Sequence, residues 1–236
     1  MEGIWVLFLG PLLAGIAVDF SSRDKAPNLK PAFMFGGAYI LALTLTHILP
    51  GILRRFDNIA IVLGLILAGL LFQFLIDKVT RGAEHGEVSG VKKVSVFTLL
   101  FGLCLHSFLE GALLGGMSSD GHGSHDSLLI GILLHKLPAA FALAMVVRNR
   151  YEMRWLRYLI VLIFALTAPI GMYLSHDLSA SGQEVRFLDG LMAFVTGNLL
   201  FVLVELFKSL NFRRWRSVEN GMLLLGLAIG LLSEII

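Results

Sequence analysis

The sequence predicts an all-α polytopic membrane protein, and three observations lead to that fold class. Of the 236 residues, 56% are hydrophobic and only 15% are charged, whereas soluble domains carry about 25% charged residues. The mean hydropathy is +0.81. Apolar runs of about 20 residues, the length of a membrane-spanning helix, recur along the chain, and the short connections between them hold most of the charge.

Eight apolar runs are predicted to be transmembrane helices. In chain order they cover residues 3–19, 32–53, 59–76, 95–117, 128–147, 158–174, 187–207 and 219–236. The first run has Glu2 in place of a basic n-region and no convincing cleavage pattern, so we interpret it as a membrane helix and not as a signal peptide. The connections leave no room for a second soluble domain, and we therefore expect residues 1–236 to form one transmembrane domain in a lipid bilayer.

The distribution of Lys and Arg predicts the orientation of these helices. The connections after the first, third, fifth and seventh helices hold 15 of the 19 basic residues. The two termini and the remaining connections hold 3, and Lys136 lies within a span. Because basic connections stay in the cytoplasm, both termini are predicted to be extracytoplasmic. The net charge of +2 is too small to favour nucleic acid as a partner.

Ionisable side chains lie in the middle of the fourth and fifth helices. His106 and Glu110 are four residues apart and therefore share one face of a helix. His135 lies in a run that is otherwise mostly apolar. Such groups at bilayer depth cost about 2.5–3.5 kcal/mol each on insertion scales and therefore mark functional sites. Two imidazoles and a carboxylate form a ligand set for a divalent metal ion, with zinc as the first candidate.

Lys136 and Pro138 flank His135 in the same helix and modify this prediction. We expect Lys136 either to pair with Glu110 or to stand where a second cation would otherwise bind. In the second case the ammonium group would keep a second divalent ion away, because like charges repel strongly at low dielectric. A proline inside a helix bends it and frees the carbonyl four residues back, here that of Leu134. Both features favour a single-metal translocation site.

Other polar residues give weaker signals. His47 is a candidate for the outer access path or an interfacial packing residue, and Asn198 and Glu205 are candidates for lining the pathway. The stretch 118–126 contains two His and two Asp, and we interpret it as a flexible polar loop. Capture of cations by this loop is the less favoured alternative. His85, next to acidic residues, could act similarly on the inner side.

Four short motifs, each in the appropriate helix, together resemble those of the ZIP (Zrt/Irt-like) metal transporters. The eight spans and the external termini agree with that family. The motifs are His47-Ile48-Leu49-Pro50, His106-Ser107-x-x-Glu110-Gly111, His135-Lys136-x-Pro138 and Gly197-Asn198-Leu199-Leu200-Phe201-Val202-x-Val204-Glu205.

The resemblance implies uptake of a divalent metal, usually zinc, toward the cytoplasm by alternating access. His106, Glu110 and His135 match the primary-site ligands of the family. Ser107 stands where many members have Asn, and Lys136 where many have the Glu or Asp of a second metal position. Ala139 stands where others have His or Glu, and these departures again favour one metal. Zn²⁺ is expected as the transported substrate and not as a prosthetic group. Its release is expected to be favoured by protonation of the ligands.

Two alternatives stay open at this stage. A membrane-embedded metallohydrolase could use Glu110 as general base, although the His-Glu-x-x-His pattern of zincins is missing. A non-transporting metal sensor with a decayed site is the other. The class of protein predicts a location in the inner or plasma membrane, and the sequence leaves a homodimer open.

Overall fold

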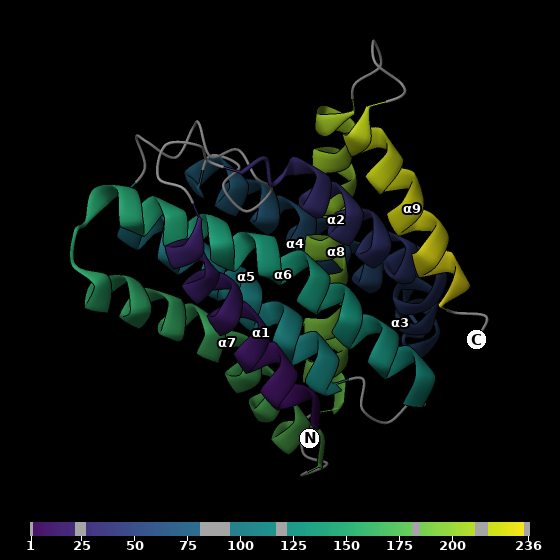
Figure 1. Ribbon diagram of the computed structural model, residues 1–236. Coiled ribbons are helices and arrows are strands. Elements are labelled where there is room, and N and C mark those ends of the chain that lie inside the picture. The colour runs from purple at the N-terminus through teal and green to yellow at the C-terminus, as the bar shows by residue number, and fades with distance from the viewer. Residues whose placement is uncertain are drawn as a thin grey trace.

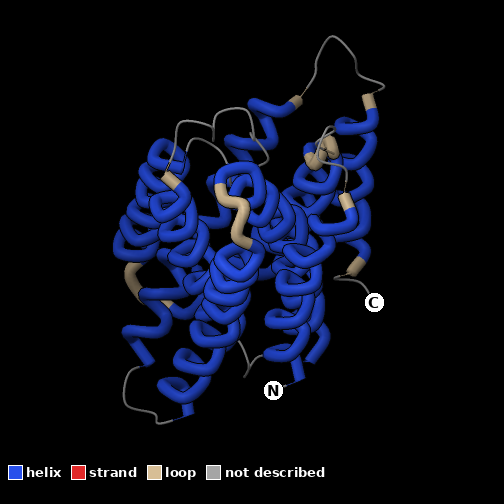
Figure 2. Tube along the Cα trace, turned by 60° about the vertical axis from the view of Figure 1, so that its left-hand side comes forward, coloured by secondary structure: helices blue, strands red, loops and turns tan. Residues whose placement is uncertain are grey.

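The computed structural model describes residues 2–21, 27–80, 95–116, 122–180, 185–210 and 217–233, and all regular secondary structure in these ranges is helical (Figures 1 and 2). The elements are α1 (Glu2–Ile16), η1 (Ala17–Phe20), α2 (Lys30–Leu43), η2 (Thr44–Ile48), α3 (Leu49–Arg55), α4 (Ile59–Thr80), α5 (Val96–Gly116), α6 (His122–Arg150), α7 (Arg154–Ala180), α8 (Val185–Ser209) and α9 (Val218–Leu232).

The all-α prediction is confirmed, and each predicted helix has a counterpart. Seven helical segments within the described ranges are long and apolar enough to cross a membrane. The eighth, α9, is apolar but has only 15 residues. The eight-span count and the external termini therefore remain predictions.

The second predicted helix is continuous but not uniform. It consists of α2, the π-helical segment η2 and α3. Pro50 lies at the start of α3 and lacks a backbone N–H, and its ring excludes the carbonyl four residues back from a normal α-helical position. A π-helical turn directly before this proline accommodates the local change in hydrogen bonding. Periodicity of apolar residues did not predict it.

Helix α6 begins earlier than predicted. The expectation of a polar loop over 118–126 is wrong for residues 122–126, which form the first turn of α6, while 117–121 lie outside the described residues. Ser and Asp are common at helix starts, where their oxygens can accept from the unpaired N–H groups of the first turn, so a polar segment of this composition can begin a helix. His85 also lies outside the described residues.

Glycines lie at the contacts of the three closest helix pairs. A Cβ on Gly111 or Gly115 of α5 would meet backbone atoms of α7 at 2.1 Å and 2.2 Å. Gly69 of α4 and Gly197 of α8 are in the same situation, because a Cβ on either would lie 1.8 Å from a carbonyl oxygen of the other helix. A Cβ on Gly226 of α9 would lie 2.3 Å from the carbonyl oxygen of Phe35 in α2.

These close pairs belong to two groups of helices. Helices α1, α5, α6 and α7 pack mainly on one another, and α2, α4, α8 and α9 do the same. The groups meet where α6 packs on α2 and where α5 contacts α4 and α8. The outer surface carries many exposed large apolar side chains, among them Trp5, Phe97 and Trp155, as a surface in contact with lipid requires.

Candidate metal site

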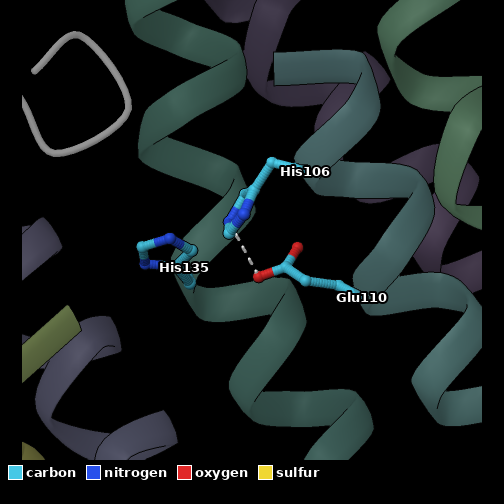
Figure 3. A group of neighbouring side chains, drawn as sticks. All are labelled: His106, Glu110 and His135. Carbon is cyan, nitrogen blue, oxygen red and sulfur yellow. Dashed lines mark ion pairs between the residues drawn. The ribbon is translucent and has the colours of Figure 1, made fainter. Parts of the chain in front are cut away.

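Three side chains predicted from the sequence lie together in the interior. His106 and Glu110 come from α5 and His135 from α6, and one ligand atom of each lies within 4.8 Å of the others (Figure 3). The relative exposures of the three residues are 5%, 0% and 3%. The rings of His106 and His135 are 5.9 Å apart, centroid to centroid. Among the described residues, this is the one group of three or more His, Cys, Asp or Glu that could hold a metal ion.

The backbone positions of these residues follow from local packing. The four-residue spacing of His106 and Glu110 places both side chains on the face of α5 that is turned toward α6. Gly36 of α2 lies directly against the backbone of His135, where a Cβ would be 3.0 Å from its nitrogen and Cα. The ring of Phe33 contacts that of His135 edge to face at 6.3 Å. The helix α6 continues through Pro138, less than one turn after His135.

The carboxylate of Glu110 has two different neighbours. Its Oε1 lies 3.2 Å from Nε2 of His106, and its Oε2 lies 3.3 Å from Nζ of Lys136. The ammonium group of Lys136 also donates to the hydroxyl of Ser107 at 2.7 Å and to its carbonyl at 3.0 Å. The predicted pairing of Lys136 with Glu110 is thus present, and Ser107 binds the lysine instead of facing the cluster as a ligand.

The other ring nitrogen of His106 contacts a side chain from α8. Nδ1 of His106 lies 3.0 Å from Oδ1 of Asn198, and Nδ2 of Asn198 donates to Oε1 of Gln73 in α4 at 2.8 Å. Asn198 and Gln73 are 0% and 1% exposed. Sequence analysis identified Asn198 only as a candidate for lining a pathway and missed Gln73. A glutamine in an otherwise apolar run was the signal that could have identified it.

The structure separates the remaining candidates from the cluster. Glu205 of α8 lines a narrow pocket that also contains His135 and Lys30, between α2, α6 and α8. It pairs with Lys208 at 2.5 Å. His47 is half-buried in the π-helical segment η2 and is not part of the cluster.

The cluster has the donor set and almost the dimensions of a zinc site. Zn²⁺ binds imidazole nitrogen and carboxylate oxygen at about 2.0–2.2 Å, which places tetrahedral ligand atoms about 3.4 Å from one another. The 3.2 Å between Nε2 of His106 and Oε1 of Glu110 already meets this requirement. The longest separation, 4.8 Å, requires a side-chain shift of about 1 Å. Three protein ligands leave a fourth position open for water or exchange.

The fold and the cluster together define a multi-pass membrane protein with a buried candidate metal site. Comparison with protein families then identifies the class more closely. The family model described as "ZIP Zinc transporter" matches residues 83–233, and the chain belongs to that family, as the sequence motifs suggested. The family is one of transporters and not of enzymes.

Individual relatives agree with this assignment. The zinc transporter ZIP9 of Xenopus tropicalis is 31% identical over 150 residues, which cover 57% of this chain and 47% of the relative. The zinc transporter ZIP1 of Plasmodium falciparum is 27% identical over 121 residues, 51% of this chain and 33% of the relative. The protein zntD of Dictyostelium discoideum is 31% identical over 139 residues, which cover 52% of this chain and 20% of the relative. The aligned part of the chain thus spans about half the length of these relatives, or less.

Proposed function

We propose that this chain transports Zn²⁺, or a similar divalent metal ion, toward the cytoplasm through a single-metal site formed by His106, Glu110 and His135. The observation that carries the proposal is the convergence of these three buried side chains within 4.8 Å in a chain of the ZIP family. Buried imidazole and carboxylate groups of this kind are rare in membranes unless they serve an ion pathway.

Lys136 supports a site for one metal ion and not two. Its ammonium group lies on the Oε2 side of Glu110, so Oε1 remains oriented toward His106. A second divalent ion on the Oε2 side would replace or closely approach a buried positive charge, which low dielectric makes unfavourable. The lysine also neutralises part of the charge of the carboxylate and so lowers the affinity for the ion. A moderate affinity suits a site that must release its ion.

The arrangement of the helices supports alternating access. All three proposed ligands belong to the group formed by α1, α5, α6 and α7, so a movement of this group would carry the complete site past α2, α4, α8 and α9. His135, Glu205 and Lys30 line one narrow pocket, which we take as the start of the route by which the ion leaves the site. Lys30 belongs to the basic, and by our prediction cytoplasmic, end of the molecule.

The remaining features of the proposal come from the sequence. We expect eight spans with both termini outside, a location in the plasma or inner membrane, and Zn²⁺ as substrate without a prosthetic group. A homodimer stays open. Asn198 and Pro138 are expected to shape the site and the pathway without binding the ion themselves.

Uptake by proteoliposomes tests the proposed site. The purified chain is reconstituted around a fluorescent zinc indicator, and Zn²⁺ is added outside. His106→Ala and Glu110→Ala are expected to abolish uptake while the protein remains folded, as judged by size-exclusion chromatography. His176→Ala is the matched control, because His176 is an exposed histidine of α7 outside the cluster, and it is expected to retain uptake. Uptake that is unchanged in both site variants would reject the assigned site.

The buried ion pair of Lys136 with Glu110 favours a second candidate function, a metal-binding protein that does not transport. Here the lysine would hold the carboxylate too firmly for the ion to pass. Zn²⁺ binding measured by titration calorimetry, together with absence of flux in the same proteoliposomes, would support this alternative. Flux that depends on His106 excludes it.

A further inference from the structure

The imidazole of His106 can bind a metal through Nε2 only if its proton is on Nδ1. Metal-binding histidines are commonly held in the required tautomer by a hydrogen bond from the other ring nitrogen. Here Nδ1 faces Oδ1 of Asn198 at 3.0 Å. Because an amide oxygen only accepts hydrogen bonds, His106 donates from Nδ1 in this arrangement. Nε2 is then the nitrogen that faces the carboxylate of Glu110 at 3.2 Å and that can exchange a proton for the metal ion.

An asparagine alone does not determine this tautomer. Its side-chain amide presents an oxygen on one side and an NH₂ group on the other, and a rotation by about 180° exchanges them. With the NH₂ group toward His106, Nδ1 would have to accept, and the proton would move to Nε2. Some further group must therefore select the orientation of the Asn198 amide.

Gln73 is in the position to make that selection. In the recorded orientation its Oε1 accepts from Nδ2 of Asn198 at 2.8 Å, so the NH₂ group of Asn198 points to Gln73 and its oxygen to His106. Gln73 is itself an amide, so the two amides must be oriented together, and a coupled pair is harder to reverse than Asn198 alone. The close backbone contact of α4 and α8 sets this geometry. Gly69 and Gly197 face each other's helix, Gln73 follows one turn after Gly69, and Asn198 is adjacent to Gly197.

We propose that Gln73 is a positioning residue for the metal site, which acts through Asn198 to hold His106 in the tautomer that presents Nε2 to the ion. This inference rests on the proposed function, because it assigns a role to Gln73 in the same site. Gln73 and Asn198 belong to α4 and α8, whereas His106 belongs to α5. The hydrogen bonds from Gln73 through Asn198 to His106, here called the relay, thus join the two groups of helices. The relay holds His106 in the binding tautomer only while α5 lies against α8.

A double-mutant cycle tests the relay. Gln73→Met keeps most of the side-chain length but removes the acceptor, and we expect it to weaken Zn²⁺ binding by about 10- to 100-fold, the usual effect of losing a group that orients a ligand. Asn198→Asp supplies two equivalent oxygens, so His106 finds an acceptor in either orientation. In the Asn198→Asp background we therefore expect Gln73→Met to change the affinity by less than about 3-fold, because the carboxylate then orients His106 without help from Gln73.

Two controls separate positioning from packing. Thr80→Val removes another buried polar group of α4, whose hydroxyl bonds only within its own helix in the described structure, and it is expected to leave the affinity unchanged. The tautomer itself is read from the ¹⁵N NMR shifts of the His106 ring in the metal-free protein, assigned by comparison with His106→Ala. We expect Nδ1 to carry a proton in the wild type, whether or not Nε2 shares one with Glu110, and to lose it in part of the molecules in Gln73→Met.

The proposal is overturned if Gln73→Met reduces the affinity equally in both backgrounds, which is the result of a packing defect, or if it changes neither affinity nor tautomer. Failure of the proposed function looks different, since Zn²⁺ binding would then be absent or insensitive to His106→Ala. The tautomer measurement requires no metal. A wild-type His106 whose Nδ1 carries no proton would overturn the relay even if Gln73→Met does not fold.

Discussion

Lys136 Nζ and Glu110 Oε2 lie 3.3 Å apart in the interior of the protein. Both side chains are almost completely buried. The contact leaves the other carboxylate oxygen 3.2 Å from His106, so one acidic group serves a fixed cation on one side and the candidate metal position on the other. The charge of the site without metal is thereby balanced.

Replacement of Lys136 by methionine tests this balance. Lys136→Met removes the cation and leaves a buried carboxylate, and breaking a buried ion pair from one side costs about 3–5 kcal/mol of stability. We expect a lower Tm without metal and a larger increase in Tm on addition of Zn²⁺ than in the wild type, because the ion then supplies the missing positive charge. Thermal unfolding in detergent with and without Zn²⁺ measures both effects.

The control for this substitution is Lys78→Met, which removes an exposed lysine of α4 and is expected to change neither value. An increase in Tm with Zn²⁺ that is equal in Lys136→Met and wild type would contradict the shared carboxylate. Loss of the metal response in Lys136→Met would show instead that the lysine helps to form the site.

A pair of glycines in α4 tests how the scaffold of the relay is built. A Cβ on Gly69 would lie 1.8 Å from the carbonyl oxygen of Phe194 in α8, whereas Gly64 has no neighbouring atom within 4 Å. Gly69→Ala must push the helices apart, at a cost of about 1–3 kcal/mol or more. Gly64→Ala is expected to be neutral or slightly stabilising, because alanine favours the helix.

Thermal unfolding of the two alanine variants gives the comparison directly, since both substitutions add the same methyl group to the same helix. Equal Tm values would show that α4 and α8 are not in close contact at Gly69. A Zn²⁺ affinity that falls in Gly69→Ala but not in Gly64→Ala would connect this contact with the site.

Asp19 lies in η1, the short segment that directly follows α1, and holds this segment against α7. Its carboxylate accepts hydrogen bonds from the buried guanidinium of Arg157 and from the hydroxyl of Tyr158. Asp19→Asn removes the negative charge opposite a buried cation, and we expect a loss of about 1–3 kcal/mol, less than for a fully buried pair because Asp19 is partly exposed. Asp19→Asn combined with Arg157→Leu is expected to lose less than the single variant, as measured by chemical unfolding in micelles.

The double variant is the internal control, since it no longer leaves an uncompensated charge. Strictly additive losses would contradict the proposed ion pair. Glu152→Gln, at an exposed carboxylate between α6 and α7, is expected to show no measurable change.

The sequence was informative about the fold wherever a simple period or composition applies. Apolar length predicted every long helix. His106 and Glu110 were identifiable as neighbours because four residues make one helical turn. His135 was identifiable by its chemistry, since an imidazole in an apolar helix has few uses other than binding or hydrogen bonding.

Features that depend on contacts between helices could not be predicted in this way. Nδ1 of His106 contacts Asn198, and Asn198 contacts Gln73. These residues come from three helices, and no local sequence pattern reveals how the three helices are aligned with one another. The π-helical turn before Pro50 depends on how one backbone segment relieves a steric conflict. The start of α6 over 122–126 was missed because Gly, Ser and Asp are common both in loops and at helix starts, and composition alone does not separate the two.

The pocket between His135 and Glu205 leads to a last prediction, on the route of the ion after it leaves the site. Glu205 is buried, lines this pocket together with His135, and pairs with Lys208. If the ion passes here, a carboxylate lowers the energy of its path, because an unscreened divalent charge in a region of low dielectric is unfavourable. We expect Glu205→Gln to reduce the maximal rate of Zn²⁺ uptake by about 10-fold, which corresponds to about 1.4 kcal/mol in the barrier.

Equilibrium binding distinguishes a pathway role of Glu205 from a role in the site itself. Zn²⁺ affinity is expected to be unchanged in Glu205→Gln, because His106, Glu110 and His135 remain in place. Lys208→Gln is the matched control, since it breaks the same ion pair but leaves the carboxylate in the pocket, and it is expected to preserve or increase the uptake rate. Equal reduction of uptake in Glu205→Gln and Lys208→Gln would mean that the ion pair is structural and that the ion leaves by another route.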